Sequence, residues 1–333
     1  MAFFSARMAI LLLALPCLAN QAGAAAYGYS YSNIFGFTIS NPTGAITVFN
    51  NIDVSHTTAT LGSRNVIHGG ANEIDALQAS LGQVLKGEND FAPQGMGNAS
   101  YARGDAQIIS SQIPPFPPGS DSTHVANVAE ILLAGTGSAD ASGRNGSSTA
   151  FAVDLVVGQD GATLALQFQA APFMQLYLDA SAATGSFANA STAFTFSIVD
   201  EAGQIVFNWA PDGELGSGIL GGTEQADDAN LNINYAQTPP SSGSLFSYDP
   251  TGCGTPTGTG TGTGCGGQFS AISDRLDAGN YTLVLNMINS AQLAVMPVTT
   301  ELPLPGTLLL LAAGLAALAG LGRLLGPDDG DRA

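Results

Sequence analysis

Carboxylates form the densest group of side chains in this sequence that could do chemistry. They lie between residues 212 and 230, together with one amide: Asp212, Glu214, Glu224, Asp227, Asp228 and Asn230. Such oxygens are ligands for Ca²⁺, but their spacing is not that of an EF-hand loop. The sequence therefore favours a solvated acidic loop that binds Ca²⁺ weakly if at all, and we expect no other cofactor.

The sequence contains few histidines and no recognisable motif for nucleophilic catalysis. The three histidines, His56, His68 and His124, share no metal-ligand spacing. No G-x-S-x-G elbow, P-loop or H-E-x-x-H motif occurs in the chain. A glycosidase needs a defined pair of carboxylates, and the sequence singles out none. We therefore expect no catalysis, with a secreted hydrolase as the least favoured alternative.

Aromatic residues offer a different function, which is sugar binding. Tyr27, Tyr29 and Tyr31 alternate and so share one face of a strand, while Trp209 ends a strand before the turn Pro211-Asp-Gly213. Either could be a platform for sugar rings, in which case the protein would be a secreted carbohydrate-binding module. Such residues more often pack a sheet or its core, and the sequence favours packing for both.

The charge of the chain excludes several partners. Acidic residues number 26 and basic residues eight, which gives a formal net charge of −18. This charge argues against nucleic acid and against electrostatic binding to anionic lipid. Charged residues nevertheless make up only 10% of the chain. The surface must therefore be largely neutral and hydrogen-bonding, which suits a polysaccharide-rich setting.

Strands must position most of these residues. Alternating segments begin in 27–62, where the turn Asn41-Pro-Thr-Gly44 predicts a hairpin, and they dominate from Phe151 onward. Turns at Gln159-Asp-Gly161 and Glu201-Ala-Gly203 separate successive strands. The fold class is therefore mainly β: a jelly-roll-like β-sandwich with one or two short helices and a C-terminal transmembrane helix.

Other segments are less regular. Apolar spacing predicts a helix near 72–85, capped by Asn72. Residues 87–120 are read as irregular and end in a proline-rich connector, 114–120. Residues 124–133 fit a helix or a strand, of which we favour the strand, and 134–148 is a flexible loop by composition. We thus divide the exported body into a β-rich part, 27–120, and a sandwich, 121–300.

The sequences at the two ends of the chain are typical of targeting signals. Residues 1–26 have the charged, apolar and small-residue regions of a secretory signal peptide, with Ala22-Gly-Ala24 or Ala24-Ala-Ala26 as the cleavage site. Export places Cys253 and Cys265 in an oxidising compartment, so the two should form a disulfide.

The C-terminal end carries an uncharged stretch, 307–322, rich in Leu and Ala. As a helix it would measure about 24 Å, and Leu324 and Leu325 extend it if Arg323 snorkels. Pro303 and Pro305 hold an extended approach just before it. We therefore predict a transmembrane helix over 307–325, with a buried core helix as the alternative.

The order Pro303-Leu304-Pro305-Gly306-Thr307, then an apolar helix, then Arg323, resembles the PEP-CTERM sorting signal in its Val-Pro-Leu-Pro variant. Leu304 stands where the commonest form has Glu, and a lone arginine replaces the usual cluster. The resemblance covers 301–333 and implies export in a Gram-negative bacterium and cleavage near the motif by an exosortase-like membrane protease. It implies a surface or extracellular-matrix protein, associated here with exopolysaccharide or biofilm and tied to the membrane through its helix before processing.

Overall fold

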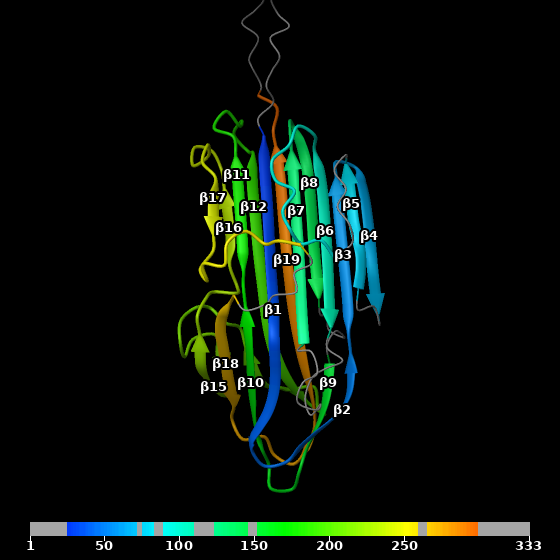
Figure 1. Ribbon diagram of the computed structural model, residues 1–333, viewed down its shortest axis with the longest axis vertical. Coiled ribbons are helices and arrows are strands. Elements are labelled where there is room, and N and C mark those ends of the chain that lie inside the picture. Colours follow the sequence, from blue (N-terminus) through cyan, green and yellow to red (C-terminus); the bar gives the residue numbers. More distant parts are fainter. Residues whose placement is uncertain are drawn as a thin grey trace, which may run out of the picture. The chain divides into compact units, whose positions relative to one another are not determined.

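The chain folds into two antiparallel sheets (Figure 1). The computed structural model describes residues 25–71, 75–82, 89–109, 123–145, 152–258 and 265–298, and within these ranges it contains strands β1 to β19 and no helix. The mainly β fold predicted from the sequence is confirmed. Met1–Pro297 forms one unit, and Val298 is the only described residue of a second unit, Val298–Ala333.

Nine strands form the first sheet, here called sheet A. Its main order is β15 (Gly222–Asp227), β18 (Gly267–Ser273), β10 (Thr163–Ala170), β1 (Ala26–Thr43), β7 (Thr123–Leu133), β6 (Tyr101–Ile109) and β5 (Asp75–Gly82). The first half of β1 also pairs with β11 (Phe173–Leu178), and β11 pairs with β17 (Phe246–Tyr248). The long strand β1 therefore holds the sheet together.

Ten strands form the second sheet, sheet B. Its main order is β14 (Ile219–Leu220), β13 (Ile205–Trp209), β12 (Phe187–Asp200), β19 (Gly279–Val295), β8 (Gly137–Asn145), β3 (Val54–Leu61) and β4 (Arg64–Ala71). Beside this path, β16 (Asn234–Gln237) pairs with β12, and β9 (Ala152–Val157) joins β19 to β2 (Ile46–Ile52).

The sheets pack face to face through alternate residues of their strands, as the two-residue period of a strand requires. One core cluster is aromatic: Phe168 lies 5.6 Å from Phe196 and 5.4 Å from Trp209, centroid to centroid. The other is built largely from alanines of both sheets, such as Ala129 and Ala190. Small residues allow the two sheets to approach more closely at this second cluster.

A polar layer runs between the sheets as well. The buried Asn289 donates from Nδ2 to the Oγ atoms of Ser30 at 2.8 Å and Ser32 at 3.1 Å, which lie on the facing sheet. Ser30 donates in turn to the Ser191 carbonyl, and Asn127 donates to the Met287 carbonyl. Buried polar groups are tolerated when they are paired, and these pairs fix how the sheets align.

The hairpin predicted around Asn41-Pro-Thr-Gly44 is wrong. Gly44 does turn the chain, with φ of 78°, but β1 and β2 do not pair. The turn carries the chain from sheet A into sheet B, where β2 pairs with β9. A turn sequence fixes a change of direction, whereas the partner of each strand is chosen by packing far along the chain.

The helix predicted over 72–85 is also wrong in its described part, because 75–82 is strand β5. Ala79 and Leu81 are buried, which is a period of two, and β5 pairs antiparallel with β6. Gly82 has φ of 110°, a conformation outside the helical region. Pairing with a neighbouring strand overrides the local helical spacing. Residues 72–74 and 83–85 lie outside the described residues.

Two segments expected to be irregular contain strands. The predicted loop 134–148 contains β8, and the stretch 87–120 contains β6. In β8 the buried residues Ala139, Ala141 and Gly143 face sheet A, so its small residues serve close packing rather than flexibility. The proline-rich connector 114–120 lies outside the described residues.

Several expectations are confirmed. The ambiguous segment 124–133 lies in strand β7, and the turns with Gly161 and Gly203 have φ of 65° and 77°. Strands from 27–120 and from 121–300 occur together in both sheets: β1 lies between β10 and β7 in sheet A, and β3 lies beside β8 in sheet B. No helix in the part of the chain described here is long and apolar enough to span a membrane. The segment 307–325 is outside that part.

Candidate functional site

The tyrosine stripe lies on the face of sheet A that points away from sheet B. Tyr27, Tyr29 and Tyr31 share this face, as the alternation predicts, and all three are buried. The segment 89–100, here called the strap, covers them, and Phe91 of the strap packs among their rings. The packing interpretation is confirmed, and these tyrosines are not an exposed platform for sugars.

A buried carboxylate lies at the centre of the covered face. The Oε1 atom of Glu130 accepts hydrogen bonds from the hydroxyl of Tyr27 at 2.9 Å and from the strap amides of Gln94 and Gly95 at 2.8 and 3.0 Å. The Tyr101 hydroxyl lies 2.9 Å both from this oxygen and from the Gly95 carbonyl, and it can donate to either. The carboxylate is thus saturated with donors from its own chain.

Arg103 completes this cluster from the neighbouring strand. Its Nη2 atom lies 2.8 Å from Glu130 Oε2, and both side chains are 0% exposed. Arg103 also donates to the strap carbonyls of Asp90 and Ala92, and the Tyr29 hydroxyl donates to the carbonyl of Phe91. The ion pair therefore fastens the strap to the sheet through charge-assisted hydrogen bonds.

The electrostatics of the cluster follow from its burial. Burial, followed by the charge of Glu130, raises the pKa of Tyr27, Tyr29 and Tyr101 well above the usual range. These hydroxyls therefore stay protonated and act as donors. Burial also raises the pKa of Asp105 to about 7, although Arg103 and nearby backbone amides oppose the rise. Because Glu130 and Arg103 both bond to backbone groups of the strap, the cluster is suited to holding the strap.

The acidic segment is organised by its own backbone. Asp227 accepts hydrogen bonds from the amides of Asp212 and Gly213, while Asp228 accepts one from Gln268. Glu224, buried beneath the loop, accepts from the indole of Trp209 and from the Gly216 amide at 2.7 Å.

Trp209 is fully buried, so the prediction that it packs in the core is confirmed. Burial raises the pKa of Glu224 and of Asp227, and neighbouring carboxylates add to both effects. These carboxylates pin turns by accepting from amides. The solvated acidic loop predicted over 212–230 is wrong at Glu224, which is buried on strand β15.

No group of three or more His, Cys, Asp or Glu among the described residues could hold a metal ion. The histidines lie apart in the fold: His56 is on β3, His68 on β4 and His124 on β7 of the other sheet. Thr57 pairs with His68, so His56 and His68 point to opposite faces of sheet B. The structure therefore does not bring any two of the three histidines together.

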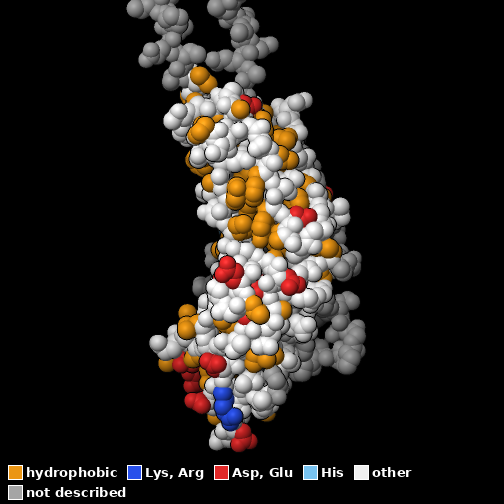
Figure 2. Space-filling model, turned by 90° about the vertical axis from the view of Figure 1, so that its left-hand side faces the viewer, with side chains coloured by type: hydrophobic (Ala, Val, Ile, Leu, Met, Phe, Trp, Pro, Cys, Tyr) orange, Lys and Arg blue, Asp and Glu red, His pale blue; other side chains and the backbone are white. Residues whose placement is uncertain are grey.

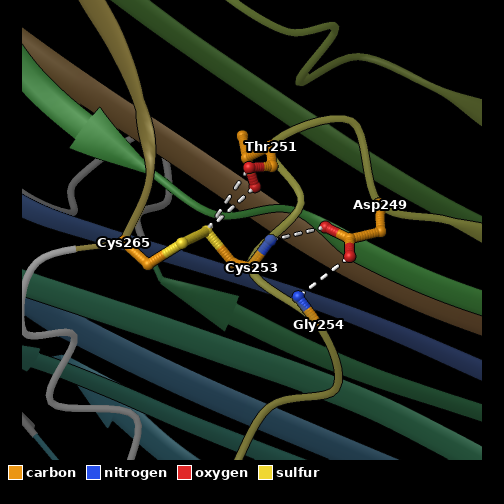
Figure 3. The surroundings of a disulfide bond; sticks show 5 residues. All are labelled: Asp249, Thr251, Cys253, Gly254 and Cys265. Atoms are coloured by element: carbon orange, nitrogen blue, oxygen red, sulfur yellow. Dashed lines mark hydrogen bonds between the residues drawn. A yellow bond between two sulfur atoms is a disulfide. The ribbon is translucent and has the colours of Figure 1, made fainter.

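The predicted disulfide between Cys253 and Cys265 is present, with a Cα–Cα distance of 5.7 Å. Asp249 caps the turn before it, because its carboxylate accepts from the amides of Cys253 at 3.1 Å and Gly254 at 2.9 Å (Figure 3). The same segment reaches the strap, where the Phe91 amide donates to the Gly258 carbonyl at 2.9 Å. The disulfide thus closes a loop that supports the covered face of sheet A.

One aromatic pair remains accessible. Tyr235 of β16 and Phe246 of β17 stack with their centroids 3.6 Å apart and their planes 6° from parallel. Tyr235 is 40% exposed, in contrast to the buried tyrosine stripe. No pattern in the sequence marks this pair, since neither residue lies in a long alternating strand and only the packing of two short strands joins them.

Of the predicted processing residues, only Ala26 is described. It opens β1, is fully buried and pairs with Leu178 and Leu133 on its two sides. Ala22, Ala24 and the predicted sorting residues Pro303, Leu304, Pro305, Gly306, Thr307 and Arg323 lie outside the described residues. The chain matches no protein-family model, no curated protein and no solved structure at a significant level.

Proposed function

We propose that this chain is an exported, non-catalytic protein of the cell surface or extracellular matrix of a Gram-negative bacterium, associated with exopolysaccharide or biofilm. An N-terminal signal peptide exports it, and a PEP-CTERM-like tail sorts it through an exosortase-like membrane protease. The body is a β-sandwich, and its jelly-roll arrangement remains a prediction from the sequence. The proposal rests on the tail motif and on one geometric relationship in the body.

That relationship is the position of the two ends of the body. A Cβ atom built on Gly28, near the start of β1, would lie 3.5 Å from Ala291 and Leu293, near the end of β19. Ala26 and Val295 belong to the same core cluster. In Figure 1 the start of β1 and the end of β19 both lie at the upper end of the sheets. The chain thus enters and leaves the body at one end, which suits a body that follows a signal peptide and precedes a membrane helix.

The chemistry of the body supports a structural role outside the cell. Its disulfide suits an oxidising compartment. Glu130, a fully buried carboxylate of the strap cluster, accepts hydrogen bonds from donors of its own chain, and the Trp209 indole donates to the carboxylate of Glu224. These carboxylates stabilise the fold through hydrogen bonds within the chain.

Processing of the tail tests this function. Mass spectrometry of the protein from the cell surface should find a new C-terminus near Pro303–Gly306. Replacing Pro303 and Pro305 together by Ala should cause uncleaved protein to accumulate in the membrane, because the helix can then extend upstream. Leu310→Val, within the predicted helix, is the matched control and should be processed normally.

Deleting 306–333 should release the body as a soluble secreted protein. If the wild-type surface protein retains residues 307–325, the segment is a permanent anchor and the sorting proposal fails.

A further inference from the structure

The pair Tyr235–Phe246 lies where the edges of the two sheets meet. Strand β16, which carries Tyr235, pairs with β12 of sheet B, and strand β17, which carries Phe246, pairs with β11 of sheet A. Figure 2 faces this side, on the left in Figure 1, and hydrophobic side chains gather midway along it. We call the surface of β16, β17 and the connecting residues 238–245 the edge face.

The aromatic rings of the edge face are held in place before any ligand arrives. Tyr235 is opposite Ala190 on the neighbouring strand, and Phe246 is opposite Leu176 and packs against the alanine-rich core. Gln237 donates from Nε2 to the Ser244 carbonyl at 3.0 Å and so joins β16 to the residues just before β17. A ring fixed in this way loses little conformational freedom on binding.

The chain segment that carries the two rings is polar but uncharged. The stretch 231–248, LNINYAQTPPSSGSLFSY, contains no Asp, Glu, Lys or Arg. It supplies exposed amide and hydroxyl groups instead, and Asn189 Nδ2 donates to Asn234 Oδ1 at 2.8 Å beside Tyr235. In Figure 2 acidic side chains, but no basic ones, lie near the hydrophobic group midway along this side. An accessible aromatic ring with neutral hydrogen-bonding neighbours is suited to a sugar, which has apolar C–H faces and hydroxyl edges.

We propose that the edge face binds a neutral polysaccharide chain, with a sugar ring stacked on Tyr235 and its hydroxyls bonded to neighbouring amides such as that of Asn234. The net charge of −18 disfavours an anionic uronate chain, and it also disfavours a second copy of this protein. This inference rests on the proposed function, since it names the partner that an exported body would meet outside the cell.

Binding to a panel of hexasaccharides tests the proposal. The processed protein is titrated calorimetrically with cellohexaose, laminarihexaose, xylohexaose and mannohexaose, and with hexagalacturonate as the anionic probe. We expect saturable binding to at least one neutral chain and weaker binding to hexagalacturonate. Tyr235→Ala should weaken the binding by about tenfold or more, which corresponds to the loss of about 1.4 kcal/mol. Tyr235→Phe keeps the ring and should stay within about threefold of wild type.

Leu220→Ala is the matched control, because Leu220 is an exposed apolar side chain on β14, away from the edge face, and its loss should leave binding unchanged. Each variant is compared with wild type by thermal unfolding. The proposal is overturned if no neutral chain binds, if hexagalacturonate binds more tightly, or if folded Tyr235→Ala binds as wild type. A wild-type dimer that Tyr235→Ala dissociates would assign the edge face to self-association instead. Correct sorting without glycan binding would reject this inference alone, whereas a retained helix 307–325 would reject the sorting proposal.

Discussion

Arg103 and Glu130 form an ion pair at 2.8 Å on the outer face of sheet A, and neither side chain is exposed to solvent. The tyrosine hydroxyls and the strap supply further hydrogen bonds to both partners of the pair. Burying two charges costs solvation energy that a pair recovers only with good geometry and further partners. The stability of the strap therefore depends on this pair.

Glu130→Gln should lower the free energy of unfolding by about 3–5 kcal/mol, because it leaves Arg103 as an uncompensated buried charge. Urea denaturation measures the difference. The double variant Arg103→Met, Glu130→Gln should recover part of the loss. Glu214→Gln, which changes an exposed carboxylate, is the control and should stay within about 0.5 kcal/mol. A loss below about 1 kcal/mol in Glu130→Gln would contradict this assignment.

The buried Asp105 should make stability depend on pH. Its pKa is raised to about 7 in the folded protein, so the folded state binds this proton more tightly than the unfolded chain. The contribution of Asp105 is then fully present below the unfolded pKa of about 4 and is lost as the pH rises through about 7.

Asp105→Asn removes that titration, so its melting temperature relative to wild type should be higher at pH 8 than at pH 5. Thermal unfolding at both values measures the change. An equal difference at both pH values would show that Asp105 does not titrate in this window.

Gly143→Ala should destabilise the protein, because the sheets approach closely at this point. A Cβ atom there would lie 2.4 Å from the Asp105 carbonyl oxygen and 2.6 Å from that of Val128. Both neighbours are backbone, so the sheets would have to separate, at a cost of about 1–3 kcal/mol or more. Gly97→Ala is the matched control, since nothing lies within 4 Å of its added Cβ. Equal stability of the two variants in urea would reject this account.

The disulfide should be formed in the exported protein and should contribute modestly to stability. A bridge with a sequence separation of 12 closes a short loop, for which the chain-entropy estimate is about 3 kcal/mol at most. Intact mass after alkylation, with and without reductant, should show both thiols protected until they are reduced. Two alkylated thiols in the unreduced sample would contradict the pairing.

Signal peptidase should cleave after Ala24 rather than after Ala26. The Ala25 carbonyl accepts a hydrogen bond from the Asp179 amide at 2.9 Å, and Ala26 is buried between two strands. A chain that begins at Ala25 retains these contacts, whereas one that begins at Tyr27 loses them. N-terminal sequencing of the exported protein should read Ala25-Ala26-Tyr27. A start at Tyr27 would show that β1 does not need the contacts of Ala25 and Ala26.

Much of the fold could be predicted because strand alternation is local. The strands after Phe151 and the glycine turns at 161 and 203 follow directly from residue types. One member of the ion pair could have been recognised from the sequence: Glu130 lies inside the largely apolar stretch 125–133. A charge in such a run has to find a partner, but its partner Arg103 is 27 residues away and follows from sheet pairing alone.

The sequence by itself determined that the chain is mainly β, that Cys253 and Cys265 pair and that the tyrosines of β1 share a face. Each of these depends on residue type and short spacing. Only the tertiary structure decided that β1 and β2 belong to different sheets, that 75–82 is a strand and that Tyr235 meets Phe246. The physical reason is that these features depend on which strands lie side by side. That choice is made by burial and pairing across long separations, and no local pattern encodes it.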